Sequence, residues 1–108
     1  MGVLVWLVTG CSSGFGEEFV RQILHRGDKV IATARRPESL GRLQSLGAVT
    51  LQLDMRASEK EMLEKIGLAT EIYGRIDVLV NNAAYIATGA WEDLKLRIIF
   101  PSYASNQF

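Results

Sequence analysis

The chain has 108 residues, which is enough for one domain around a single hydrophobic core. Apolar residues make up 48% of it and charged residues 22%, and twelve basic residues balance twelve acidic ones. A net charge of zero excludes the basic excess with which proteins typically bind nucleic acids or membrane surfaces. We therefore expect an ordinary globular chain with neither of these partners.

The expected location follows from the cysteine content and from the N-terminus. Cys11 is the single cysteine, so no internal disulfide can form, and a reducing compartment is favoured. Residues 3–8 are apolar but too few to span a bilayer, and no signal-peptide pattern surrounds them. Trp6 stands where a myristoylation signal needs Ser or Thr. The sequence predicts a cytoplasmic protein.

Alternation of apolar runs and amphipathic patterns predicts the elements in chain order. The apolar runs predict strands at residues 3–8, 29–34, 49–53 and 76–80. The first run is uninterrupted, as is typical of parallel strands buried on both faces. Helical periodicity lies between the strands. The residues expected on the buried helix faces are Phe15, Phe19, Val20, Ile23 and Leu24, then Leu40, Leu43 and Leu46, then Met62, Ile66, Ala69 and Tyr73.

Capping residues mark the ends of these helices. Pro37 lies near the start of the second helix. Ser58 and Glu61 have the spacing of a capping box at the start of the third. A glycine is expected to end each helix, and these glycines are Gly27, Gly47 and Gly74.

The order of elements predicts the fold and its limits. Strands alternating with helices indicate an α/β fold with right-handed crossovers. We expect a Rossmann-like, doubly wound parallel sheet, truncated after about four strands. Residues 1–93 form this unit, and residues 94–108 complete no further βα unit and are expected to be an irregular, divergent tail. The fourth strand would then be an open edge, which favours self-association unless the tail or a partner covers it.

A glycine-rich turn between the first strand and the first helix is the principal candidate site. Gly10, Gly14 and Gly16 give the pattern TGxxxGxG. Unpaired N–H groups and the dipole of a helix N-terminus attract a pyrophosphate, and glycines allow its close approach. The context of a preceding strand and a following helix supports this interpretation over a turn with no ligand. A P-loop is excluded, because no Lys-Ser/Thr pair follows the last glycine.

Three motifs together resemble the short-chain dehydrogenase/reductase family. They are TGxxxGxG after the first strand, Asp54 after the third, and Asn-Asn-Ala-Ala after the fourth, and the resemblance covers roughly residues 1–93. It implies a dinucleotide as the small-molecule partner. The residues that it places at the cofactor are Gly10, Ser12, Ser13, Gly14, Phe15 and Gly16 at the pyrophosphate, Asp54 and Met55 at the adenine, and Asn81 and Ala83 at the nicotinamide-side ribose.

Each of these residues also has a purely structural interpretation. Asp54 could cap the loop between strand and helix, and Asn81 and Asn82 could be turn residues. Ala84 departs from the family, which more often has glycine at this position.

The residues after the second strand indicate which dinucleotide is bound. NAD-binding sheets place an acidic residue there for the ribose 2′-hydroxyl, whereas an arginine accommodates the 2′-phosphate of NADP. This chain has Ala34-Arg35-Arg36 and no acid. We therefore predict that Arg35 binds the phosphate and that NADP is preferred over NAD. The alternative is that both arginines belong to a solvated helix entry, and this applies to Arg36 in particular.

No residue of the chain is predicted to be catalytic. The resemblance implies a catalytic Tyr-x-x-x-Lys pair, but Gly89 follows Tyr85 and Gln107 follows Tyr103 at the lysine position. Cys11 is interpreted as a turn residue rather than a nucleophile. The sequence thus predicts the NADP(H)-binding portion of an oxidoreductase without its catalytic half. The alternatives are a non-catalytic binding or interaction module and a non-functional fragment.

Overall fold

The computed structural model describes residues 2–12, 14–54 and 56–82, and the backbone of residues 97–99. The strands are β1 (Val5–Val8), β2 (Lys29–Ala34), β3 (Val49–Gln52), β4 (Val78–Val80) and β5 (Arg97–Ile99). The helices are α1 (Gly14–His25), the 3₁₀ helix η1 (Pro37–Leu40), α2 (Gly41–Leu46) and α3 (Glu59–Tyr73).

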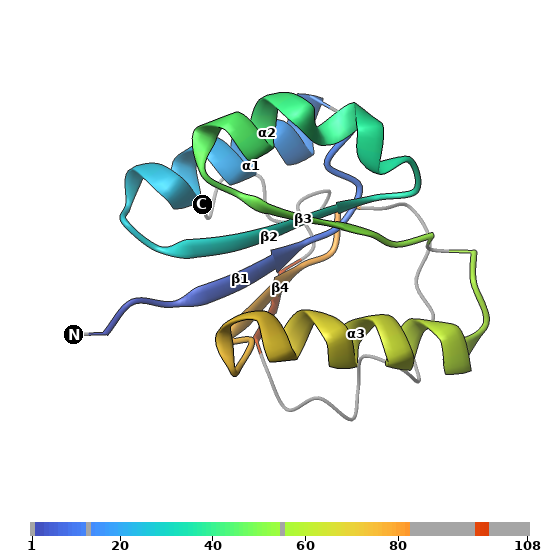
Figure 1. Cartoon of the computed structure of the whole chain (residues 1–108). Coiled ribbons are helices and arrows are strands. Elements are labelled where there is room, and N and C mark those ends of the chain that lie inside the picture. The colour runs from blue at the N-terminus through green and yellow to red at the C-terminus, as the bar shows by residue number, and fades with distance from the viewer. Residues whose placement is uncertain (1, 13, 55, 83–96, 100–108) are drawn as a thin grey trace.

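The strands form one parallel sheet with the order β3-β2-β1-β4-β5. Helices α1 and α2 cover one face and α3 covers the other, as Figure 1 shows. This is the doubly wound, Rossmann-like arrangement that the order of elements predicts. The order of the strands reverses at β1: β2 and β3 follow on one side of it, and β4 and β5 on the other. In such folds ligands bind beyond the carboxyl ends of the strands at this reversal.

The strands bury both faces because alternate side chains point to opposite sides. On the α1 and α2 side the core contains Trp6 and Val8 of β1, and on the α3 side it contains Val5 and Leu7. All four of these β1 residues are buried. This two-sided burial is why the sequence of β1 is an apolar run rather than an alternating pattern.

The helix faces agree with the predicted ones at most positions. Val20 and Ile23 of α1 and Met62 and Ile66 of α3 are fully or almost fully buried. Two predicted core residues are wrong: Phe15 is 49% exposed and Leu46 is 45% exposed. Phe15 lies in the first turn of α1, and Leu46 is the last residue of α2. Leu24 and Tyr73 are also not fully buried, but they pack against the core.

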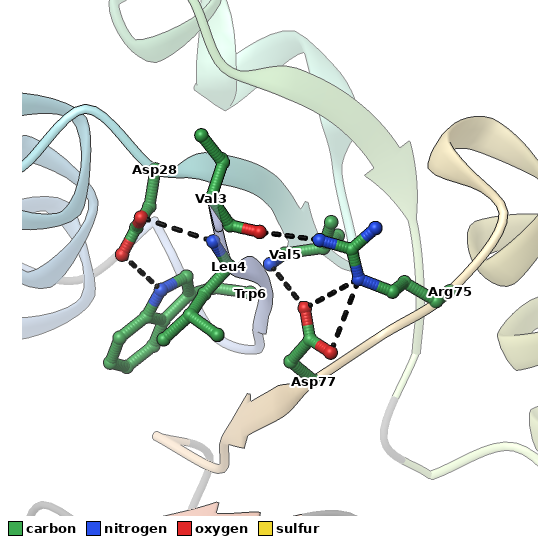
Figure 2. A network of polar contacts seen from close by, with 7 residues as sticks. All are labelled: Val3, Leu4, Val5, Trp6, Asp28, Arg75 and Asp77. Carbon is green, nitrogen blue, oxygen red and sulfur yellow. Dashed lines mark hydrogen bonds and ion pairs between the residues drawn. The ribbon is translucent and has the colours of Figure 1, made fainter. Parts of the chain in front are cut away.

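Two aspartates hold the start of β1, as Figure 2 shows. Asp28 accepts hydrogen bonds from the Leu4 amide (3.1 Å) and from the Trp6 indole N–H (3.0 Å). On the other side, Asp77 accepts from the Val5 amide at 2.8 Å, and the Asp77 amide donates to the Val5 carbonyl at 2.8 Å. These bonds satisfy backbone groups that precede the sheet ladder.

The segment after residue 93 differs in part from the irregular tail that the sequence predicts. Its residues Arg97–Ile99 form β5, which pairs in parallel with β4 in the register Val78↔Arg97 to Val80↔Ile99. β4 is therefore not an open edge, because the tail covers it, which is the exception that the sequence analysis allowed. The free backbone donors and acceptors of β4 provide a template for a further strand, and the short run Arg-Ile-Ile occupies it.

Candidate functional site

The glycine turn connects the carboxyl end of β1 to α1. Gly10 has φ of 64°, a left-handed conformation that glycine adopts without the steric penalty of a Cβ. Helix α1 begins at Gly14 and has 12 residues. The first N–H groups of a helix have no partner within the helix, and the positive end of the helix dipole lies at the same end, which here adjoins the turn. Ser13 lies outside the described residues.

Gly14 and Gly16 have different surroundings. A Cβ on Gly16 would lie 2.7 Å from the Gly10 carbonyl oxygen, 2.8 Å from Asn82 Nδ2 and 2.9 Å from Cys11 Cα. The first turns of α1 therefore contact the backbone of the turn directly, which only glycine permits. A Cβ on Gly14 would have no atom within 4 Å. Gly14 thus leaves open space beside the turn, where a ligand can approach the backbone.

Cys11 supports the turn from inside and is not a nucleophile. It is 2% exposed, its amide donates to the Thr33 carbonyl at 2.9 Å, and its Sγ–H donates to the Val8 carbonyl at 3.2 Å. Burial raises the pKa of its thiol to about 12. Because only a thiolate is strongly nucleophilic, the structure favours the turn residue that the sequence predicts.

The residues after β4 lie beside the glycine turn, because β1 and β4 are adjacent and parallel. The Thr9 amide donates to the Val80 carbonyl at 3.0 Å, and the Asn82 amide donates to Thr9 Oγ1 at 3.0 Å. The Asn82 side chain then donates from Nδ2 to the Gly10 carbonyl at 3.1 Å. Asn82 therefore connects the end of β4 to the glycine turn and is more than a turn residue. The sequence alone did not reveal this contact.

Asn81 has a buried donor. The residue is 3% exposed, and its Oδ1 lies 3.4 Å from the Thr9 hydroxyl, which donates to it. Within the part of the chain that the structure describes, its Nδ2 has no hydrogen-bond partner. A buried unpaired amide costs about 1–3 kcal/mol. This donor is therefore a candidate for contact with a ligand at the carboxyl end of β4. Ala83, the other residue predicted there, lies outside the described residues.

A pocket of about 190 Å³ adjoins the glycine turn at the end of β2. Ser12 lines it from the turn, and Arg35, Arg36 and Ser39 line it from the segment after β2. The Ser39 hydroxyl donates to the Arg36 carbonyl at 2.7 Å, across the first turn of η1. The structure thus brings Arg36 and Ser39 to the same place as Arg35. From the sequence, the alternative of a solvated helix entry applied to Arg36 in particular, and Ser39 was not predicted to lie here.

Asp54 follows β3 and caps the loop that leads to α3. Its Oδ1 accepts from the Arg56 amide at 2.9 Å and from Arg56 Nε at 3.2 Å. The Arg56 side chain holds the pKa of the Asp54 carboxyl below its usual value. These contacts are those of the loop-cap interpretation. The predicted contact with adenine stays a prediction, and Met55 lies outside the described residues.

The described residues contain little that suggests other chemistry. Tyr73, the last residue of α3, packs partly buried against the core, and His25 is exposed at the end of α1. Tyr85 and Tyr103 lie outside the described residues. Across residues 2–12, 14–54, 56–82 and 97–99, no group of three His, Cys, Asp or Glu side chains could hold a metal ion. The same part of the chain has no helix with the length and apolarity to cross a membrane.

Known proteins resemble the chain in sequence and fold. The model of the short chain dehydrogenase family matches residues 4–108. Oxidoreductase BOA17 of Botryotinia fuckeliana is 39% identical over 94 residues, which are 83% of this chain and 34% of that protein. The NADP-dependent 3-hydroxy acid dehydrogenase YdfG of Salmonella typhi is 45% identical over 85 residues, 74% of this chain and 33% of that protein.

A solved structure shows the same arrangement of elements. The crystal structure of a short-chain dehydrogenase from Streptomyces avermitilis superposes with a TM-score of 0.71 at 41% identity. The alignment covers 76% of this chain and 31% of that one. The chain thus spans about a third of the length of the curated relatives that it matches.

Proposed function

The chain belongs to the short-chain dehydrogenase family, and from this premise we propose that it is the NADP(H)-binding portion of an oxidoreductase. In the complete protein, hydride would pass between NADP(H) and a carbonyl or alcohol. The 108 residues contain no Tyr-x-x-x-Lys. We therefore assign cofactor binding, rather than turnover, to the residues of this chain.

The groups around the glycine turn fit a dinucleotide. Gly14 leaves open space at the N-terminus of α1, where backbone N–H groups would bind the pyrophosphate. The buried Nδ2 of Asn81 offers a donor at the carboxyl end of β4. Bound NADP(H) supplies the hydride chemistry, and these residues bind and orient it. Asp54, Met55 and Ala83 remain proposed contacts to the adenine and the ribose.

The pocket of Ser12, Arg35, Arg36 and Ser39 is the observation that carries the proposal of NADP over NAD. Two arginines and two serines line about 190 Å³ directly beside the turn. Among the residues that the structure describes, no acidic side chain lines this pocket. A phosphate suits this lining, because charge-assisted bonds to arginine contribute roughly 1.5–3 kcal/mol each. The name of the YdfG relative, an NADP-dependent enzyme, supports the same cofactor.

Titration of the chain with NADPH and with NADH tests this proposal. We expect NADPH to bind at least about tenfold more tightly, since one charge-assisted bond exceeds the 1.4 kcal/mol that corresponds to one decade. Arg35→Asp should weaken NADPH binding and reduce or reverse the preference. Arg36→Asp should have a smaller effect in the same direction. Arg42→Asp, an equal charge reversal on an arginine that pairs with Glu17 outside the pocket, is the control.

Two outcomes would contradict the proposal. Binding of neither dinucleotide would remove the assignment of a cofactor site. Unchanged relative binding of NADPH and NADH in Arg35→Asp would remove the role of the pocket. Incubation of the chain with NADPH and a panel of ketones, monitored by absorbance, tests the separate assignment of binding without turnover. NADPH oxidation above the level of the buffer would contradict it.

A further inference from the structure

The side chain of Asn82 packs against Gly16 so closely that a Cβ at Gly16 would clash with it. The position of a Cβ at Gly16 is only 2.8 Å from Asn82 Nδ2, and 2.7 Å from the Gly10 carbonyl oxygen that accepts the Asn82 hydrogen bond. The Asn82 amide donor and the Gly10 carbonyl acceptor thus both lie against the Cα of Gly16, where no Cβ separates them. The conformations of these three residues are therefore coupled, although Asn82 lies 72 residues from Gly10.

The sheet brings Asn82 to this point. Val8 and Val80 are partners in the parallel register of β1 and β4, so the residues after each strand lie side by side. The Asn82 amide donates to Thr9 Oγ1 at 3.0 Å, which fixes the backbone of Asn82 next to the start of the turn. From there its side chain reaches across to the Gly10 carbonyl at 3.1 Å.

The Gly10 carbonyl matters because of its position at the start of the turn. Gly10 has φ of 64°, and glycine peptides in such turns can rotate at little steric cost. A rotated peptide could direct a carbonyl oxygen, which is partially negative, toward the place where phosphate oxygens approach. The Gly10–Cys11 peptide is held on both sides, because its N–H donates to the Thr33 carbonyl at 2.9 Å and its oxygen accepts from Asn82 Nδ2 at 3.1 Å. The bond from Asn82 is the one that holds the oxygen itself toward β4. The oxygen then does not point to the place where an anion would approach the N-terminus of α1.

We propose that Asn82 is a positioning residue for the pyrophosphate-binding turn, acting through the Gly10 carbonyl in the space left by Gly16. This inference rests on the proposed function, since it concerns the same cofactor site. It differs from a brace between β1 and β4 alone in one respect. A brace affects every ligand and the stability of the sheet, whereas a positioning residue affects mainly ligands that carry the pyrophosphate.

The test compares two ligands on the full 108-residue chain. NADPH contains the pyrophosphate, and adenosine 2′-monophosphate contains the 2′-phosphate but no pyrophosphate. The variant is Asn82→Asp, which keeps the size of the side chain but replaces the donor with a carboxylate facing the Gly10 carbonyl. Gln44→Glu, the same change of group on the exposed surface of α2, is the matched control. Ligand-observed NMR or calorimetry measures both dissociation constants, and circular dichroism confirms the fold.

We expect Asn82→Asp to weaken NADPH binding about tenfold or more, because a donor is lost and a charge faces a carbonyl oxygen. Binding of adenosine 2′-monophosphate should change less than about twofold, because that ligand leaves the glycine turn empty. Gln44→Glu should change neither constant. Should Asn82→Asp fail to fold, Asn82→Ala removes the donor without adding charge, and the same comparison of ligands applies to it.

The outcomes separate this inference from the function on which it rests. If Asn82→Asp binds NADPH as tightly as the wild type does, the positioning role alone is overturned. Equal weakening of both ligands would assign Asn82 to the sheet as a brace and would also overturn it. A wild-type chain that binds no NADPH would overturn the proposed function, and the positioning role with it.

Discussion

Removal of the Asp77 carboxylate should destabilise the fold through the start of β1. Val5 is 2% exposed, so its N–H has no access to water once its partner is gone. The partner is Asp77 Oδ2 at 2.8 Å, which also accepts from Arg75 Nε at 3.0 Å (Figure 2). In Asp77→Ala the amide of Val5 is left buried and unpaired. Such a group costs about 1–3 kcal/mol, so we expect a loss of about 2 kcal/mol.

Most of this loss should come from the bond to Val5 and little from Arg75. The Arg75 side chain is 54% exposed, and exposed ion pairs contribute about 0–1 kcal/mol that salt screens. For a domain of this size, about 2 kcal/mol lowers the Tm by roughly 10 °C. Thermal unfolding followed by circular dichroism measures the shift. Glu64→Gln, which removes an exposed carboxylate on α3, should leave the Tm nearly unchanged.

The same bond predicts a dependence of stability on pH. The hydrogen bond from Val5, followed by the Arg75 side chain, holds the pKa of the Asp77 carboxyl below its usual value in the folded chain. Because the folded pKa is the lower one, this stabilisation is complete above the unfolded pKa, which is about 4. It is lost as the pH falls through the folded pKa. The Asp77→Ala variant should therefore lose less stability than the wild type between about pH 5 and pH 2.

Either of two results would refute this reasoning. A Tm of Asp77→Ala within about 2 °C of the wild type would show that the Val5 amide finds another partner at little cost. A loss of equal size in Arg75→Ala would show that the contacts of the arginine, rather than the bond to Val5, stabilise this end of the sheet.

Three further predictions concern the turn and the helix caps. Gly16→Ala should lower the free energy of unfolding by about 1–3 kcal/mol, since its Cβ would overlap backbone atoms. Gly14→Ala places its Cβ in open space and should be tolerated. Equal thermal stabilities of the two variants would contradict this prediction. Cys11 should react with Ellman's reagent at pH 8 far more slowly in the folded chain than in guanidinium chloride, because burial raises the pKa of its thiol to about 12. Similar rates in the two conditions would show that the thiol is accessible. Ser58→Ala should lower the free energy of unfolding by about 1 kcal/mol in urea denaturation, because Ser58 Oγ accepts a hydrogen bond from the Glu61 amide at 3.2 Å. Ser45→Ala, at an exposed position of α2, should leave it nearly unchanged. No difference between the two variants would mean that the cap does not stabilise α3.

Local patterns were sufficient to predict strands β1 to β4, the helices between them and their order. The start of α3 at Glu59 follows the Ser58 cap, and the glycines after α1, α2 and α3 all have positive φ. Hydrophobic periodicity and capping depend on residues within a few positions of each other, so the sequence displays them directly. The position of the glycine turn between β1 and α1 was predictable for the same reason.

The limits of the sequence analysis lie where contacts join distant residues. The roles of Asp28 and Asp77 were not predicted, because the amides that donate hydrogen bonds to them lie 24 and 72 residues away. Residues 94–108 were assigned to an irregular tail, because a three-residue strand has no periodicity of its own and is defined only by its partner β4.

The sequence by itself determined the type of site: a glycine turn before a helix, with arginines after the next strand. Only the tertiary structure decided which residues complete it. The parallel pairing of β1 with β2 and with β4 places Arg36 and Ser39 beside Ser12, and Asn82 against Gly10. The physical reason is that the ends of neighbouring parallel strands converge at one edge of the sheet, whatever their separation along the chain.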